Sequence, residues 1–194
     1  MPKRGDSSAY TLNNQQVKAV LSACLDLLDR VIIGCLLFLG LSPDEIVHVR
    51  ADWITQDGNL KIPTSMPCNC TSCSRKGNTT WRPRGKAKNR TLPIPPRFRR
   101  DLGEILRVQP YGLNVSRITV YNRTKAVLRR ARVKIPGPAR NTAFPDALRA
   151  TCAKMLRESG MSTEALAYYM GIESIPVRQR AKDSAIKQAK AIFA

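Results

Sequence analysis

The apolar run VIIGCLLFLGL, from Val31 to Leu41, constrains the fold of this 194-residue chain more than any other segment. A helix needs roughly 20 apolar residues to cross a bilayer, and this run is too short to do so. We therefore expect a helix that is buried inside a protein core. A chain of this length can form one domain whose core covers such a helix.

The residues that follow predict where the next helix begins. In the sequence SPDE, Ser42 is a suitable N-cap and Pro43 suits the first turn of a helix. The acidic pair Asp44 and Glu45 favours the positive end of the helix dipole. A helix is therefore expected from Ser42 to about Val49.

The remaining pattern is mostly helical. Apolar residues at helical spacing predict helices over 13–26, 29–39, 97–108, 116–133, 144–159, 162–170, 174–180 and 183–193. Two short strands around an Asp57-Gly58 turn, within residues 52–63, and a third strand at 90–95 interrupt the helices. The predicted fold class is mainly α with a small three-stranded antiparallel β-sheet.

The chain divides into three parts in this interpretation. Residues 1–12 form a disordered arm without the apolar core of a secretory signal, and residues 13–182 form one domain. Within this domain, residues 64–89 form a basic, cysteine-containing hairpin, which we call the insert. Residues 183–194 form a C-terminal helix. The six cysteines are scattered, which favours an intracellular protein with reduced thiols over a disulfide scaffold.

The positive charge is concentrated in the middle of the chain. The formal net charge is +19, and residues 75–140 carry 19 Lys and Arg against two acidic residues. Such a segment repels itself unless a polyanion neutralises it, and nucleic acid is the favoured polyanion. A solvated basic face that only keeps the protein in solution is an alternative. An anionic membrane is disfavoured because the segment lacks a basic amphipathic helix.

The insert, the start of the following strand and the helix at 116–133 hold the candidate DNA-contacting side chains. These are Arg75, Lys76, Arg82, Arg84, Lys86, Lys88, Arg90, Arg123, Lys125, Arg129 and Arg130. Phosphate contacts position a protein on DNA without reading its sequence. We therefore expect binding to double-stranded DNA with little or no sequence preference.

Cys68, Cys70 and Cys73 form a C-x-C-x-x-C motif in the insert. A structural zinc site needs four ligands, so the motif is one ligand short. The fourth ligand comes from another chain, or the motif has lost its metal, or the thiols are free. The only histidine, His48, is expected to face the small sheet or solvent. The other three cysteines, on predicted helices, are expected to be buried.

Three segments resemble the catalytic domain of the tyrosine recombinase (phage integrase) family. LLFLGLSPDEIVHVRADWI resembles its first signature, KNRTLPIP resembles the strand after its lysine hairpin, and DALRATCAKMLRESGMSTEALAYYMGIESIPVRQRA resembles its second signature. The resemblance covers nearly all of residues 14–194. The cysteines of PCNCTSC and the WRP approach to the third strand favour the archaeal and archaeal-virus branch. The N-terminal DNA-clamping domain of full-length integrases has no room in this chain.

The family cuts DNA with a tyrosine hydroxyl, which needs activation because the pKa of a tyrosine is about 10. Two arginines stabilise charge on the phosphate, and a lysine or histidine protonates the leaving oxygen. The resemblance implies that Arg149 is the surviving second arginine. Arg84 or Lys86 stands in for the hairpin lysine.

The resemblance also implies that the other positions have lost their chemistry. Ser42 replaces the first arginine, Asp146 replaces the first histidine of the second signature, and Ala150 replaces the second histidine. Ile172 stands where a His or Trp is expected, and Ala181 stands at the nucleophile. Alanine cannot form a phosphotyrosyl bond, and a carboxylate at position 146 repels a phosphate. We therefore expect that the chain does not cut DNA.

The predicted function is a recombinase-derived protein that coats, packages or organises duplex DNA of an archaeal virus or mobile element, in the cytoplasm or in a virion nucleoprotein. Arg149 and Arg178 complete the set of candidate DNA contacts. The C-terminal helix packs on its own core or docks on a neighbouring protomer, which would give a homo-oligomer. The alternatives are a site-specific regulator, and a recombinase with a non-standard nucleophile, Tyr168 or Tyr169, although both tyrosines are expected to be core aromatics.

Overall fold

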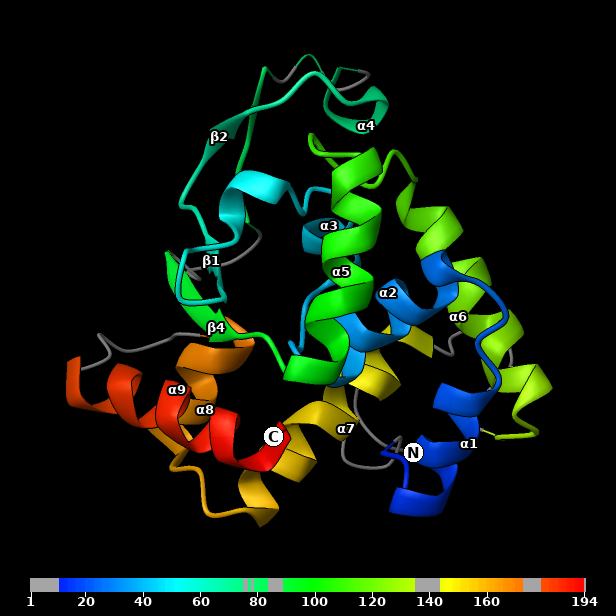
Figure 1. Ribbon diagram of the computed structural model, residues 1–194, viewed down its shortest axis with the longest axis vertical. Helices are drawn as coiled ribbons and strands as arrows, with labels where there is room; N and C mark the ends of the chain where they lie inside the picture. The colour runs from blue at the N-terminus through cyan, green and yellow to red at the C-terminus, as the bar shows by residue number, and fades with distance from the viewer. Residues whose placement is uncertain are drawn as a thin grey trace.

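A computed structural model of the chain describes residues 11–74, 77, 79–83, 89–134, 144–172 and 179–193 (Figure 1). The helices in these ranges are α1 (Asn14–Ser22), α2 (Leu27–Leu37), α3 (Pro43–Ile46), α4 (Thr71–Ser74), α5 (Pro96–Val108), α6 (Arg117–Arg130), α7 (Phe144–Glu158), α8 (Thr163–Met170) and α9 (Gln179–Phe193). The strands are β1 (Asn59–Ile62), β2 (Met66–Pro67), β3 (Thr80–Trp81) and β4 (Arg90–Pro93). None of the described helices is long and apolar enough to cross a membrane.

Helix α2 is the centre of the core, as the apolar run predicts. It packs against α5, α6 and α7 (Figure 1), and the side chains from Val31 to Leu37 are buried. Gly34 allows the close approach of α5, because a Cβ at this position would lie 2.3 Å from a ring carbon of Phe98. The predicted buried helix is therefore confirmed, and it determines where the other helices lie.

The predicted start of α3 is also confirmed. Ser42 is the N-cap, Pro43 occupies the first turn, and Ser42 and Glu45 form a reciprocal capping box. This box satisfies backbone N–H groups at the helix start and holds the Glu45 carboxylate beside the N-cap.

The predicted class, mainly helical with a small antiparallel sheet, is confirmed, but the sheet differs in detail. Strands β1 and β4 pair with Leu60 opposite Leu92, and β2 and β3 form a separate two-stranded sheet in the insert. The expected strand at 52–54 is a 3-10 turn (Ala51–Trp53), followed by one isolated bridge from Ile54 to Leu60. Within the turn, the Trp53 N–H donates to the Arg50 carbonyl and the Ile54 N–H to the Ala51 carbonyl, while the Ala51 N–H donates to the Pro110 carbonyl.

Helix α9 packs on the core of its own chain. Ala185 and Ala189 are fully buried, and the ring of Phe193 lies 5.6 Å from the ring of Phe38. Because α9 begins at Gln179, the predicted boundary between residues 182 and 183 falls inside a helix. Most of the helix predicted at 174–180 and of the arm predicted at 1–12 lies outside the described residues.

Candidate nucleic-acid interface and metal centre

Glu45 and Arg90 form a buried ion pair beside the start of α3. Arg90 Nη1 lies 2.7 Å from Glu45 Oε1, and Arg90 is only 2% exposed. The Glu45 Oε2 atom accepts hydrogen bonds from the Ser42 N–H and hydroxyl at 2.8 and 2.9 Å. Burial raises the pKa of Glu45, but Arg90 outweighs burial and holds this pKa below its ordinary value. The sequence predicted Arg90 as a DNA contact, whereas its place in β4 directs it to an internal carboxylate.

Arg149 on α7 is held by carbonyl groups of its own chain. Its Nε donates to the Gly40 carbonyl at 2.9 Å, and Nη2 donates to the Met170 carbonyl at 3.3 Å. Asp146 lies one turn away, with its Oδ1 3.9 Å from Arg149 Nη1. The Arg149 side chain is 21% exposed and the Asp146 side chain 59%. The guanidinium that the resemblance assigns to phosphate binding therefore has internal partners and a carboxylate at its exposed end.

The two tyrosines of α8 are core residues, as expected. The Tyr168 hydroxyl accepts the Thr91 N–H at 2.9 Å, and the Tyr169 hydroxyl donates to the Phe38 carbonyl at 2.7 Å. Tyr169 is fully buried, which raises its pKa well above the ordinary value. Neither side chain presents a free hydroxyl on the surface. Ala181, at the expected nucleophile position, is half-buried on α9.

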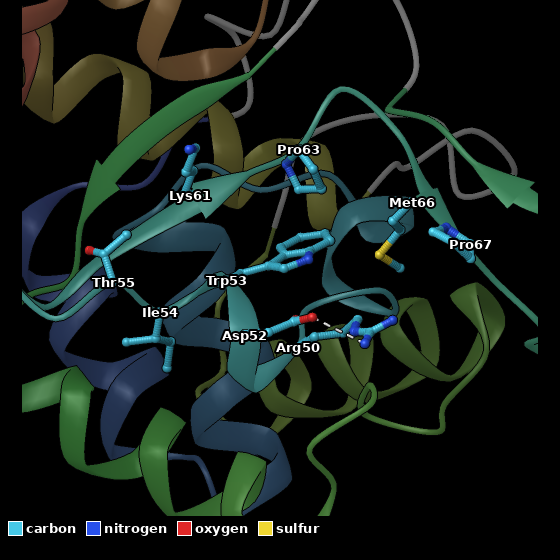
Figure 2. A pocket seen from close by; sticks show the side chains of 9 residues that line it. All are labelled: Arg50, Asp52, Trp53, Ile54, Thr55, Lys61, Pro63, Met66 and Pro67. Atoms are coloured by element: carbon cyan, nitrogen blue, oxygen red, sulfur yellow. Dashed lines mark ion pairs between the residues drawn. The ribbon is translucent and has the colours of Figure 1, made fainter.

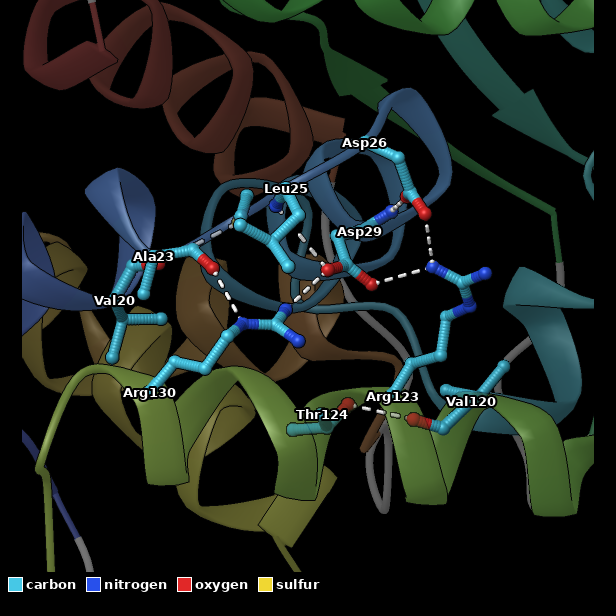
Figure 3. Close-up of polar contacts among 10 residues, drawn as sticks. Val20, Ala23, Leu25, Asp26, Asp29, Val120, Arg123, Thr124 and Arg130 are labelled. Carbon is cyan, nitrogen blue, oxygen red and sulfur yellow. Dashed lines mark hydrogen bonds and ion pairs between the residues drawn. The ribbon is translucent and has the colours of Figure 1, made fainter.

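Two arginines of α6 bind carboxylates at the start of α2 (Figure 3). Arg123 Nη1 lies 2.6 Å from Asp26 Oδ2 and 2.8 Å from Asp29 Oδ1. Arg130 forms an ion pair with the other Asp29 oxygen, and its Nε donates to the Ala23 carbonyl at 2.9 Å. These contacts fix α6 against the junction of α1 and α2. Arg123 and Arg130, both predicted as DNA contacts, are thus already neutralised within the chain.

The other predicted DNA contacts divide into two groups. Lys125 and Arg129 on α6 and Arg82 after β3 are exposed. The following predicted contacts lie outside the described residues: Arg75, Lys76, Arg84, Lys86, Lys88 and Arg178. Further exposed cations lie on α5 and just after α6: Arg97, Arg99, Arg100, Arg107, Arg132 and Lys134.

The three cysteines of the insert meet His48. The ligand atoms of His48, Cys68, Cys70 and Cys73 all lie within 4.8 Å of one another, so the cluster could hold a metal ion. His48 Nε2 is 3.4 Å from Cys70 Sγ and 3.5 Å from Cys73 Sγ. His48 is 3% exposed, so the expected alternative that it faces solvent is wrong, and the side chain faces the insert cysteines and Trp81 of β3. Burial, together with the neighbouring thiols, raises the pKa of Cys73 to about 12.

The neighbours of His48 hold its ring in one orientation. Its Nδ1 lies 2.6 Å from the Asp44 carbonyl oxygen, and its ring stacks on Trp81 with the centroids 4.7 Å apart. Trp81 in turn stacks on Trp53, and its indole N–H donates to the Asp44 carboxylate at 2.9 Å. The ring is therefore fixed by α3 on one side and by β3 of the insert on the other.

The sequence contained only a weak signal that His48 lies next to the three insert cysteines. His48 precedes the first cysteine of the motif by twenty residues and lies in a different predicted element. The one usable clue was numerical, because three cysteines and one histidine make a four-ligand set. The chain path that brings the end of α3 next to the insert could not be read from the spacing.

A separate pocket of about 500 Å³ lies beside the cluster, between β1, β2 and the 3-10 turn (Figure 2). Arg50 and Asp52 form an ion pair of 3.1 Å at its edge, and Trp53, Met66 and Pro67 contribute apolar surface. None of the four metal-ligand candidates lines this pocket.

Comparisons with known proteins bear on the fold. No family model and no curated protein matches the sequence. A solved structure, the integrase from mycobacterium phage Brujita, matches with a TM-score of 0.69 over 100% of this chain, at 17% sequence identity. The fold is similar to that of a phage integrase. This chain spans 61% of that integrase's length. The integrase-like fold predicted from the sequence is therefore confirmed.

Proposed function

We propose that the chain is a recombinase-derived protein that binds duplex DNA without cutting it. The observation that carries the DNA-binding part is the charge distribution on an integrase-like fold. Residues 75–140 hold 19 Lys and Arg against two acidic residues, and exposed members of this set lie on α5, on α6 and after β3. Such a surface supplies sequence-independent affinity through phosphate contacts.

The absence of cutting is proposed from the side chains at the expected catalytic positions. Ala181 has no hydroxyl, and the hydroxyls of Tyr168 and Tyr169 are hydrogen-bonded in the core. Arg149 donates to two backbone carbonyls, and Asp146 places a negative charge at its exposed end. A phosphate entering there would have to displace internal hydrogen bonds and approach a carboxylate.

The proposal extends to the biological role and to the cofactor. The protein coats, packages or organises DNA of an archaeal virus or mobile element, and copies of the chain assemble on DNA. Low sequence preference is expected because phosphate contacts do not read bases. Zinc is proposed as a structural cofactor at the cluster of His48 and the three insert cysteines.

A salt series tests DNA binding. Fluorescence anisotropy with two unrelated duplexes should give similar affinities, and log affinity should fall with log salt by about 0.9 for each phosphate contact. An interaction that is undetectable or independent of salt would overturn the proposal. Strong preference for one duplex over its scrambled version would instead favour the site-specific regulator.

A nicked duplex substrate tests the absence of cutting. An active recombinase traps itself covalently on such a substrate, which gives a slow protein–DNA band on a denaturing gel. We expect no such band. A covalent band that disappears in Tyr168→Phe or Tyr169→Phe would identify a non-standard nucleophile and refute the proposal.

A further inference from the structure

The distances in the insert cluster match those of a metal site. Tetrahedral zinc with Zn–S of 2.3 Å and Zn–N of 2.0–2.1 Å places nitrogen and sulfur ligands about 3.6 Å apart. His48 Nε2 lies 3.4 and 3.5 Å from the sulfur atoms of Cys70 and Cys73. All four ligand atoms, including the Cys68 sulfur, lie within 4.8 Å of one another, which is close enough to share one metal ion.

We propose that His48, Cys68, Cys70 and Cys73 form a complete, four-coordinate zinc site within one chain, and that its metal fastens the insert to α3. This inference deepens the zinc assignment of the proposed function by naming the fourth ligand. It does not depend on DNA binding, because all four ligands come from one chain and lie among the described residues.

The orientation of His48 suits metal binding. The Nδ1 atom lies 2.6 Å from the Asp44 carbonyl oxygen, so Nδ1 carries the proton and donates it. The Nε2 lone pair then points at the sulfur atoms. A histidine ligand whose other nitrogen donates to a carbonyl is the usual arrangement in zinc sites, since it fixes the tautomer and the ring.

The donor set selects the class of metal. Three thiolates and one imidazole favour zinc over magnesium or calcium, which prefer oxygen ligands. Four protein ligands fill a tetrahedral shell, so no position remains for a water or a substrate. The site is therefore structural, and the metal adds no catalytic group.

The backbone explains why the insert needs such a site. Strands β2 and β3 pair over only two residue pairs, Met66 with Trp81 and Pro67 with Thr80. A ladder of this length is not stable alone. The metal joins the end of β2 and α4 to His48, just beyond α3, so it cross-links the insert to the helical core. Trp81 stacks on the same imidazole and closes the site from β3.

Metal content tests the site directly. The full chain, purified under reducing conditions, should carry one zinc per monomer by native mass spectrometry. His48→Gln and Cys73→Ser should each weaken zinc binding by at least tenfold, while Cys24→Ser, which changes a thiol outside the cluster, should bind like the wild type. Zinc should also protect Cys68, Cys70 and Cys73 from alkylation.

Two results would overturn the proposal. The first is that the reduced protein binds no zinc. The second is that His48→Gln keeps one zinc per monomer at unchanged affinity. If His48→Gln does not fold, the cobalt-loaded wild type decides. Tetrahedral absorption with charge-transfer intensity for three thiolates supports the site, and octahedral cobalt or fewer thiolates refutes it. A normal zinc result without DNA affinity would refute the proposed DNA binding and leave the site intact.

Discussion

The surroundings of Arg149 and the base of the insert use polar side chains in different ways. At the start of α3, Arg90 and Arg149 face inward and bond to Glu45 and to backbone carbonyls. At the base of the insert, four side chains that sequence separates converge on one point. Cationic groups thus have internal partners where the resemblance implies phosphate chemistry, whereas the ligand groups of the insert converge with His48 on one point. A residue's type therefore says less about its role than its neighbours do.

The largest effect is expected from breaking the buried pair. Glu45→Ala leaves the Arg90 guanidinium buried without its partner, and the free energy of unfolding should fall by about 3–5 kcal/mol. Urea unfolding measures this change. Asp146→Ala, which removes the more exposed and longer ion pair with Arg149, is the matched control and should change stability by less than about 1 kcal/mol. Equal losses in the two variants would contradict the distinction.

Zinc should produce the next largest effect on stability. Metal at 100 times its dissociation constant stabilises a folded protein by about 2.7 kcal/mol when the unfolded chain does not bind it. We expect thermal unfolding to shift upward with zinc in the wild type and in Cys24→Ser, and not in Cys73→Ser. Chelation should reverse the shift. It should also weaken DNA binding, because the insert carries predicted DNA contacts.

Acid should weaken the buried ion pair of Glu45 and Arg90. The folded-state pKa of Glu45 lies below the ordinary value of 4.5, so the ionised carboxylate stabilises the fold above that pH. This stabilisation is lost as the pH falls below 4.5 toward the folded-state pKa. The free energy of unfolding of the wild type should therefore drop in this range. Glu45→Gln should be less stable at neutral pH and show a shallower drop, and an identical slope would contradict the pKa direction.

The two kinds of α6 arginine give a smaller but sharper contrast. Arg129→Gln removes an exposed cation and should reduce the salt slope of DNA binding by about 0.9. Arg123→Gln removes a cation that Asp26 and Asp29 already neutralise, so the slope should stay the same while stability falls. Anisotropy titrations and urea unfolding of both variants separate these effects. A reduced slope for Arg123→Gln would show that DNA displaces the aspartates.

The parts of the fold that depend on local sequence could be predicted. The buried α2 followed from an uninterrupted apolar run, and the start of α3 followed from an N-cap serine, a proline and two acidic residues in a row. The core position of Tyr168 and Tyr169 followed from their apolar neighbourhood. In each case the physical cause lies within a few residues of the effect.

The site depends on contacts that local sequence does not contain. Arg123 meets Asp29 across 94 residues, and Arg90 meets Glu45 because β4 turns its first side chain inward opposite Ile62. Charge alone favoured the surface for both arginines. The position of His48 was predicted incorrectly for the same reason. Its cysteine partners lie at least twenty residues further along the chain, after strand β1. Long-range pairing decided which cations remain outside.

Arg149 should contribute less to DNA binding than the exposed cations of the insert. Arg149→Gln keeps an amide donor for the Gly40 carbonyl and removes the charge. The guanidinium already donates to two backbone carbonyls and pairs with Asp146. DNA affinity should therefore change by less than about twofold, and the salt slope should not change. Removing Arg82 together with other insert cations should weaken binding far more. A large loss from Arg149→Gln, with the free energy of unfolding unchanged, would mean that DNA opens the Asp146 contact and that Arg149 binds a phosphate.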